Sequence, residues 1–255
     1  MKSELEVIAA VSLVVLMALS SYSVLLLRRS AKKLNRNADR VSKELKGQTS
    51  QIKNELSYVY QQLEALEQLL PLLKLTAPLP PSRGWAASPD FLLSLFETSK
   101  NRKPRLVLEL GSGVSTLVLA KSGAKKIISL DHSLEYGEQT RAMLANHKVR
   151  GVEIRIDELE NYQGGFSWYS RASLQSISKI DLLVIDGPPS ATNPDARYPA
   201  LENLLPLLSA KATIILDDAN RADERKLADA FAAALPNHRL RFLHHEKGTA
   251  IIEPR

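Results

Sequence analysis

The pattern of apolar and polar residues divides the chain into a helical amino-terminal part and a part in which strands alternate with helices. The first apolar run, Val7 to Leu27, holds 21 residues without a charge. In a helix this run is about 30 Å long, roughly the thickness of the hydrocarbon core of a bilayer. The sequence therefore predicts a transmembrane anchor within residues 1–30.

A cleaved signal peptide is the alternative, with Ala18 and Ser20 as the small residues before the cut. The amino end is poor in positive charge, because two glutamates offset Lys2. The apolar run also resumes beyond the supposed cut, from Val24 to Leu27. Both features favour a retained anchor.

Charge after the apolar run predicts the orientation of this anchor. Residues 28–53 carry nine lysines or arginines against two acids, whereas the whole chain carries a net charge of +6. Basic residues stay on the cytoplasmic side of a membrane. We therefore expect a single-pass protein of the cell (inner) membrane whose large domain is cytoplasmic. A basic stretch beside a membrane does not imply a nucleic-acid partner, and we expect none. The chain has no cysteine, which excludes disulfides and thiolate metal sites.

Residues 31–76 are predicted to form a helical stalk, because apolar positions alternate spacings of four and three as in the seam of a coiled coil. The seam positions are Leu34, Ala38, Val41, Leu45, Gln48, Ile52, Leu56, Val59, Leu63, Leu66 and Leu70. The four-residue step from Ile52 to Leu56 is a stutter, which locally unwinds a supercoil. Two interpretations stay open: a stalk that pairs two copies into a homodimer, and an amphipathic helix that folds against its own domain.

A proline-rich linker, residues 77–87, ends the helix and precedes a domain predicted over residues 88–255. Ser88 and Pro89 predict the N-cap and first position of a short helix that runs to Phe96.

Seven apolar strand candidates follow in this domain: "RLVLEL", "KIISLD", "VEIRID", "DLLVID", "TIILDD", "RLRFLH" and "TAIIEP". Helices are predicted between the first five strands and again before the sixth. The short turn "HEKG" predicts that the last strand runs antiparallel. This order predicts an α/β fold, a Rossmann-like seven-stranded, mostly parallel sheet with helices on both faces.

The turn Gly111-Ser112-Gly113 follows the first predicted strand, where open parallel sheets bind ligands. The two glycines let the backbone bend and approach a ligand closely. A helix that begins near Ser115 and Thr116 would point its free N–H groups at that ligand. Dinucleotides and S-adenosylmethionine both use such a turn.

Two residues favour S-adenosylmethionine over a dinucleotide. Thr116 stands where the dinucleotide fingerprint has its third glycine. Glu109, at the end of the first strand, would repel a pyrophosphate, and it suits a ligand that carries an ammonium and a sulfonium group. Asp131 can accept hydrogen bonds from the ribose hydroxyls of either ligand. A nicotinamide-dependent oxidoreductase therefore remains the alternative enzyme.

The motifs "VLELGSGVSTLVLA", "IISLDHS", "DLLVIDGPP" and "IILDDANR" resemble those of class I S-adenosylmethionine-dependent methyltransferases. The resemblance is greatest to a bacterial branch with a "GSGVSTL" turn and an "IDGPP" fourth strand, and it covers roughly residues 83–254. With the glycine turn and the helix start, it implies a cofactor site made of Glu109, Gly111, Ser112, Gly113, Ser115, Thr116, Asp131, His132 and Asp157. Asp131 would hold the ribose, His132 would flank the adenosine, and Asp157, with Glu158 as a competing candidate, would face the adenine.

The candidate catalytic residues are Asp186, Asp217 and Asp218, at the ends of the fourth and fifth predicted strands. One carboxylate would remove a proton from an acceptor hydroxyl. Alternatively, Asp186 with Asp217 or Asp218 and Asn220 would hold Mg²⁺. Metal-dependent O-methyltransferases of this fold carry an Asp–Asn pair on strand five, whereas this sequence has Asp–Asp, so metal dependence stays open. Asp218 is also a candidate N-cap of the following helix.

Four other side chains have two interpretations each. Arg197 and Tyr198 would contact an anionic or sugar acceptor, or would be a surface charge and a packed aromatic. Trp168 and Tyr169 would cover the pocket or belong to the core.

We therefore expect a membrane-anchored methyltransferase that uses S-adenosylmethionine. Its expected acceptor is the hydroxyl of a small molecule or a lipid-linked glycan. The alternative outside enzymes is a membrane-tethered coiled-coil adaptor with a cofactor-binding domain.

Overall fold

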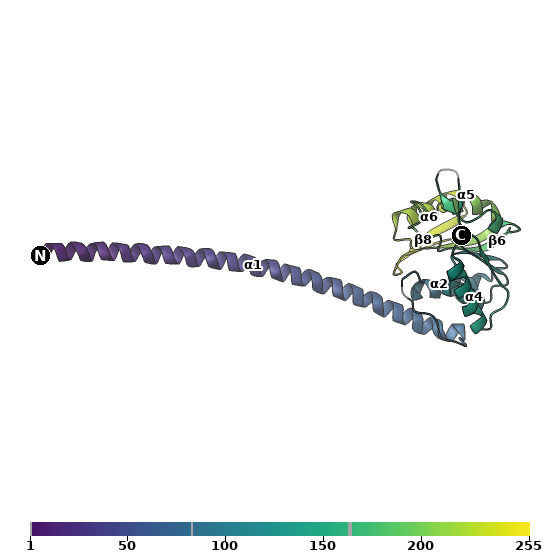
Figure 1. Cartoon of the computed structure of the whole chain (residues 1–255), viewed down its shortest axis with the longest axis horizontal. Helices are drawn as coiled ribbons and strands as arrows, with labels where there is room; N and C mark the ends of the chain where they lie inside the picture. Colours follow the sequence, from purple (N-terminus) through teal and green to yellow (C-terminus); the bar gives the residue numbers. More distant parts are fainter. Residues whose placement is uncertain (1, 83, 163–164) are drawn as a thin grey trace. The chain divides into compact units, whose positions relative to one another are not determined.

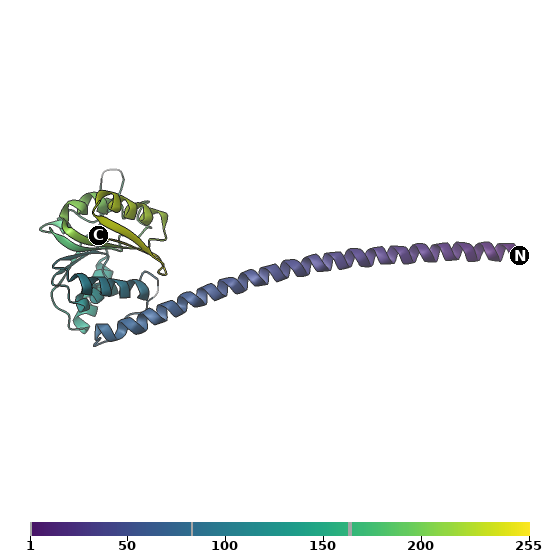
Figure 2. The same ribbon diagram turned by 180° about the vertical axis from the view of Figure 1, so that it is seen from behind.

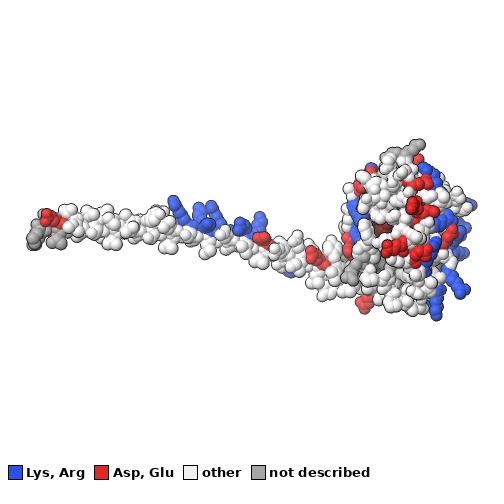
Figure 3. Space-filling model, in the orientation of Figure 1, with Lys and Arg blue, Asp and Glu red and all other residues white. Residues whose placement is uncertain are grey.

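The computed structural model describes residues 2–82, 84–162 and 165–255. The chain divides into two compact units, Met1–Ser57 and Tyr58–Arg255. Helix α1 spans Lys2–Leu73, so it makes up the first unit and continues into the second (Figure 1). The charge-coloured surface shows an uncharged stretch of this helix followed by a basic one (Figure 3).

By length and composition, α1 qualifies as a membrane-spanning helix. Its most apolar window of 18 residues has a mean hydropathy of 2.3 and is not buried at all. A retained anchor and a signal sequence share this property.

The second unit is built on a seven-stranded sheet with the strand order β3-β2-β1-β6-β7-β9-β8. The strands are β1 Val107–Leu110, β2 Ile127–Asp131, β3 Val152–Ile156, β6 Ile180–Ile185, β7 Leu208–Asp217, β8 His238–Leu243 and β9 Thr249–Pro254. Pairing is parallel from β3 through to β7, whereas β9 is antiparallel to both β7 and β8. The predicted mostly parallel sheet with an antiparallel last strand is confirmed.

Helices cover both faces of this sheet, as predicted: α2 Pro89–Arg102, α3 Val114–Ser122, α4 Leu134–Asn146, α5 Pro199–Leu204 and α6 Ala222–Ala234. Figures 1 and 2 show α5 and α6 on one face and α2 and α4 on the other. Leu108 and Leu110 of β1 join the core cluster of α6, whereas Val107 joins that of α2 and α3. Because side chains alternate along a strand, Glu109 points to the same face as Val107.

The last turns of α1 pack into the second unit. Ala65, Leu69 and Leu73 are buried in the core cluster that also contains Phe91 and Leu95 of α2. The interpretation of an amphipathic helix folded against its own domain therefore holds for these turns. Leu63 and Leu70 stay exposed.

The prediction of a helix between β3 and β6 is wrong. The described residues there form β4 Glu160–Asn161, which pairs antiparallel with β5 Ser167–Trp168, and a 3₁₀ turn, Ala172–Leu174. The sequence of this stretch mixes glycine, serine and aromatic residues, which have weaker helix propensity than alanine or leucine.

Helix α2 begins as predicted, with Ser88 as the N-cap and Pro89 in the first position. It continues to Arg102, well beyond the predicted end at Phe96, because the buried face repeats with helical spacing as far as Ser99.

One buried carboxyl group, that of Asp90, joins three parts of the second unit. It accepts hydrogen bonds from the Gln62 side chain on α1 at 2.7 Å and from the Glu246 backbone N–H, in the β8–β9 turn, at 2.8 Å. The Ser88 hydroxyl donates to it at 2.6 Å. The same turn holds the linker, since the Lys247 ammonium donates to the Ala86 carbonyl at 2.9 Å.

Candidate active site

A cavity of about 1360 Å³ opens at the carboxyl ends of the parallel strands. It is lined by the turns after β1, β2, β6 and β7 and by residues 78–81 and 84–87 of the linker. Strand order reverses between β1 and β6, and ligands of open α/β sheets bind at such a switch point.

The glycine turn after β1 lies on the floor of this cavity. Gly111 has a φ of +90°, and a Cβ added there would be 3.1 Å from the Asp186 carbonyl oxygen. Only glycine combines this backbone conformation with so close an approach of two turns. The Ser112 backbone N–H and hydroxyl both donate to Oδ2 of Asp131, at 3.0 and 2.5 Å. The turn is therefore fixed to the end of β2.

Asp131 and His132 line the cavity with Gly111, Ser112, Gly113 and Ser115. The second carboxylate oxygen of Asp131 accepts from the Ser133 N–H at 2.9 Å. Each carboxylate oxygen has more than one lone pair, so Asp131 can still accept from a ligand hydroxyl. The structure thus brings six of the nine predicted cofactor residues to one wall.

Glu109 and Thr116 lie beneath that wall, and neither is among the described residues that line the cavity. Thr116 donates to Oε2 of Glu109 at 2.6 Å and accepts from the Gly113 N–H at 3.0 Å, so it ties the acid to the glycine turn. The other oxygen of Glu109 has no hydrogen-bond partner among the described residues. Complete burial raises the pKa of Glu109 to about 7, although nearby hydroxyls oppose the change.

Asp157 and Glu158 do not line the cavity either, and both are exposed. Asp157 accepts a short hydrogen bond from the Ser173 hydroxyl, which belongs to the 3₁₀ turn. The structure therefore places the predicted adenine contact outside the cavity lining.

The three predicted catalytic acids are brought together, since each offers an oxygen within 4.8 Å of the others. Their environments differ. Asp186 and Asp218 line the cavity, whereas Asp217 lies behind them with both oxygens buried and unpartnered among the described residues. Burial, together with the negative charges of Asp186 and Asp218, raises the pKa of Asp217 well above its usual range. Both causes favour the protonated form of Asp217.

Asp186 is the acid best placed to meet a ligand. Its side chain is 18% exposed, against 7% for Asp218. Burial raises the pKa of Asp186 to about 6, with Arg197 acting in the opposite direction. Asp186 is thus ionised at neutral pH and titrates close to it, as a general base requires.

Asp218 is occupied by two cations. Its Oδ2 accepts from Arg197 at 2.7 Å and from Arg221 at 2.9 Å. The prediction that Asp218 caps the following helix is wrong, because Arg221 is the N-cap of α6 and Asp218 precedes it with a φ of +62°.

Arg197 is not a surface charge, and it is among the residues that line the cavity. Its guanidinium, 5% exposed, donates to the backbone carbonyls of Pro188, Asp186 and Asp217 at 3.1–3.3 Å. It also reaches the carboxylate of Asp186 at 3.4 Å. Arg197 therefore joins the turns after β6 and β7 and supplies a positive charge between their acids.

A divalent cation fits this cluster poorly. Arg197 already lies against both Asp186 and Asp218, and a second cation within a few ångströms would be repelled strongly in so buried a place. Asn220, the fourth predicted ligand, is exposed and does not line the cavity. Its backbone N–H donates to the Lys247 carbonyl at 3.0 Å. The structure gives no support to the predicted Mg²⁺.

Tyr169, predicted either to cover the pocket or to belong to the core, is 1% exposed and is among the residues that line the cavity. Its hydroxyl has no partner among the described residues and lies beside Gly187, where a Cβ would collide with it. Two parts of the wall were not predicted as site residues. Lys247 comes from the β8–β9 turn. Trp85, from the linker, is 66% exposed at the rim. The sequence signal for Trp85 was a large aromatic residue within the proline-rich linker.

Comparisons with known proteins agree with this geometry. A family model described as a methyltransferase domain matches residues 108–219, which run from β1 to just past β7. No curated protein matches the sequence.

Solved structures match the second unit. A methyltransferase from Podospora anserina, solved with SAH bound, has a TM-score of 0.53 and 17% identity over 76% of this chain and 87% of that one. An O-methyltransferase from Bacillus cereus in complex with SAH has a TM-score of 0.52 and 20% identity, covering 75% and 91%. The O-methyltransferase TomG from Streptomyces achromogenes, in complex with SAM, has a TM-score of 0.50 and 14% identity, covering 78% and 95%.

At these identities the likeness establishes the fold, and the family match adds the class of domain. The chain therefore has the Rossmann-like, seven-stranded fold of these structures, and its residues 108–219 match the model of a methyltransferase domain.

Proposed function

We propose that this protein is a membrane-anchored, S-adenosylmethionine-dependent O-methyltransferase. The observation that carries the proposal is the glycine turn, which Ser112 fixes to Asp131 in a cavity that Asp186 also lines. Methyltransferases with this fold have been solved with SAM or SAH bound.

The residues of the cavity suit this cofactor, which supplies an electrophilic methyl group when bound. Asp131 retains lone pairs for ribose hydroxyls. Glu109, one of whose oxygens has no partner among the described residues, would lose its proton more readily beside a cationic ligand, because a positive charge favours the ionised carboxylate. A pyrophosphate would disfavour that ionised form, so a dinucleotide fits less well.

Asp186 would accept the proton of the acceptor hydroxyl. It is more exposed than Asp218, and burial brings its pKa to about 6. Arg197 would keep Asp186 oriented and would balance the charge of the cluster. Tyr169, whose hydroxyl lacks a partner, would donate a hydrogen bond to a ligand oxygen.

The acceptor would be a small molecule or a lipid-linked glycan that reaches the cavity at the membrane. The cavity exceeds the roughly 300–1,000 Å³ of a usual single-ligand site, so a second molecule has room beside the donor. Residues 7–27 would hold the chain in the cell (inner) membrane, with the second unit in the cytoplasm, because basic residues follow the apolar run.

Calorimetry of the detergent-solubilised full chain tests the cofactor. We expect saturable binding of S-adenosylmethionine and none of a nicotinamide dinucleotide. Asp131→Ala should weaken binding of S-adenosylmethionine, and Asp229→Ala, an exposed change on α6, should not. Binding of the dinucleotide alone would replace the proposal with the oxidoreductase.

Labelling tests the acceptor and the anchor together. Membranes that contain the full chain are incubated with methyl-labelled S-adenosylmethionine and separated into lipid, glycan and protein. We expect label in the lipid or glycan fraction, and none with Asp186→Asn. Deletion of residues 7–27 should release the protein into the soluble fraction. If no fraction carries label and the chain still binds partner proteins, the adaptor interpretation is favoured.

A further inference from the structure

Helix α1 carries an apolar stripe that its own unit cannot cover. The unit Met1–Ser57 consists of this one helix. Along it, the five large apolar seam residues are 49–70% exposed: Leu34, Val41, Leu45, Ile52 and Leu56. A helix with a continuous apolar stripe gains stability only when that stripe is buried against another surface.

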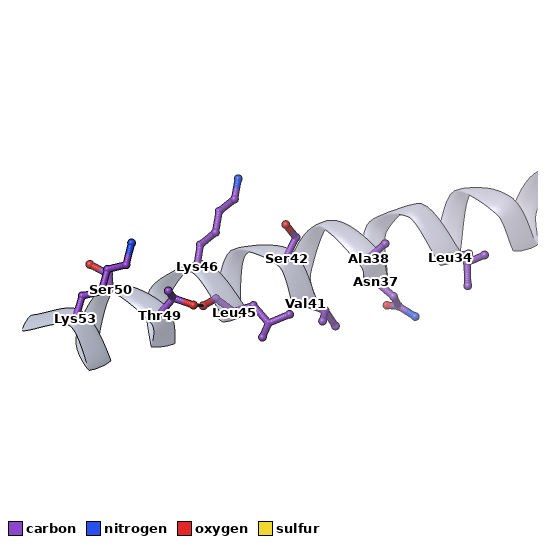
Figure 4. Close-up of a pocket in the computed structure, with 10 residues that line it drawn as sticks. All are labelled: Leu34, Asn37, Ala38, Val41, Ser42, Leu45, Lys46, Thr49, Ser50 and Lys53. Carbon is purple, nitrogen blue, oxygen red and sulfur yellow. Dashed lines mark hydrogen bonds between the residues drawn. The ribbon is translucent and has the colours of Figure 1, made fainter. Parts of the chain in front are cut away.

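The stripe lies on one side of the helix and is free of charge. Figure 4 shows Leu34, Val41 and Leu45 pointing to one side, and Lys46 and Ser42 to the other. A groove along the helix is lined by stripe residues, by the small side chains of Ser42, Thr49 and Ser50, and by Lys46 and Lys53. A facing helix can place its own side chains into such a groove.

The basic residues are arranged so that two copies can approach. Between residues 34 and 53, every lysine and arginine lies away from the seam and from the positions next to it: Arg36, Arg40, Lys43, Lys46 and Lys53. The positions that flank the seam are Asn35, Asn37, Ser42, Glu44, Thr49 and Gln51. In a parallel pair Glu44 of one copy faces Thr49 of the other, so no like charges meet.

We infer that residues 34–56 form a parallel, in-register, two-stranded coiled coil with a second copy of this chain. A strip that is apolar at its centre and carries only one charge at its flanks, that of Glu44, is complementary to itself. Gln48, the polar residue within the seam, pairs best with its own copy and so fixes the register. The parallel orientation rests on the proposed membrane anchor, since both copies enter the same bilayer from the same end.

The absence of cysteine makes disulfide cross-linking a direct test. Leu45→Cys places one thiol in the seam, and Lys43→Cys, two residues earlier, places one on the opposite face. Bridged cysteines need Cα atoms within about 7 Å of each other. Full-length chain in native membranes is oxidised and run on a non-reducing gel. We expect a covalent dimer with Leu45→Cys and almost none with Lys43→Cys.

Equal cross-linking at the two positions, or none at position 45, would overturn the inference. The mass of the detergent-solubilised full chain gives a second measurement. It should be that of a dimer, and Leu45→Asp with Ile52→Asp should reduce it to a monomer. A monomeric wild-type chain would likewise contradict the pairing. Binding of S-adenosylmethionine, measured on the same samples, reports separately on the proposed activity, because these substitutions lie in the other compact unit.

Discussion

Glu109 is the residue whose environment differs most from that of an ordinary glutamate. It is fully buried, one of its oxygens accepts from Thr116, and the other has no partner among the described residues. Burial of a carboxylate without enough donors is unfavourable, so the folded protein retains the proton of Glu109 up to about pH 7, against an ordinary pKa of 4.5.

This retained proton makes stability depend on pH. Between pH 4.5 and 7 the unfolded chain loses the Glu109 proton while the folded chain keeps it, so stability falls as pH rises through this window. We expect Glu109→Gln to remove that fall, which amounts to about 3 kcal/mol at most. Urea unfolding of the ligand-free protein at pH 5 and pH 8 measures it. Glu202→Gln, an exposed change, should leave the pH dependence intact. The idea fails if Glu109→Gln behaves like this control.

Asp186 and Asp217 are neighbours with opposite expected behaviour. A base must be ionised, so the methyl-transfer rate should fall as pH drops below about 6, the pKa to which burial brings Asp186. Asp186→Asn should lower the rate about 100- to 10,000-fold, the usual contribution of a general base. The raised pKa of Asp217 favours its protonated form, which asparagine resembles in shape, and Asp217 lies behind the cavity wall. Asp217→Asn should therefore retain most activity. Equal losses in both variants would remove the distinction.

The position of Arg197 predicts that methyl-transfer activity does not depend on a divalent metal. Because its guanidinium already lies against Asp186 and Asp218, we expect activity to be unchanged after exhaustive treatment with EDTA and after addition of Mg²⁺. Arg197→Ala should lower the free energy of unfolding by about 3–5 kcal/mol, as removal of one partner from a buried ion pair does. Loss of activity in EDTA that Mg²⁺ restores would show that a metal, after all, completes the cluster.

At the scale of elements, the periodic segments were predictable and the irregular ones were not. Strands β1, β2 and β6 are short apolar runs, and their carboxyl ends carry Glu109, Asp131 and Asp186 within two residues of the strand end. Such positions follow from the pattern alone. The β4–β5 ribbon has no comparable period, since two paired residues in each strand leave no pattern to read.

The same limit applies within the site. That Asp131, Ser112 and Asp186 meet at one edge follows from parallel strands and their turns. The position of Arg197 in the acid cluster cannot be predicted in this way, because the loop after β6 has no repeating pattern. The path of this loop depends on the Pro188 and Asp217 carbonyls that Arg197 contacts. Burial of Glu109 beneath the turn likewise depends on packing of α2 and α3, which the sequence does not specify locally.

Asp90 connects elements that are distant in the chain, and its removal should destabilise the contacts between them. Asp90→Ala would leave the side-chain amide of Gln62 and the N–H of Glu246 without their acceptor. We expect a loss of about 2–3 kcal/mol in the free energy of unfolding, since buried donors without partners are costly. Urea unfolding of the full chain measures it. Asp229→Ala, exposed on α6, is the matched control, and similar effects in the two variants would contradict the role of Asp90.

At the scale of the whole molecule, the second unit should require the end of α1 for its stability. Leu69 and Leu73 are completely buried in the core that α2 shares. A chain that begins at residue 58 should fold and bind S-adenosylmethionine, whereas one that begins at residue 77 loses both leucines. Each buried leucine contributes about 2–5 kcal/mol, which together approach the total stability of a domain. Thermal unfolding by circular dichroism compares the two chains, and equal midpoints would contradict this dependence.

Substitutions are tolerated less readily in one wall of the cavity than in the other. Gly111 and Gly187 press two turns together so closely that neither position can accept a side chain. The opposite wall is a linker of prolines, alanines and the exposed Trp85, where substitutions meet solvent more than core. Over evolution the linker wall can therefore change its residues, and with them the shape of the cavity, while the two glycine turns stay fixed.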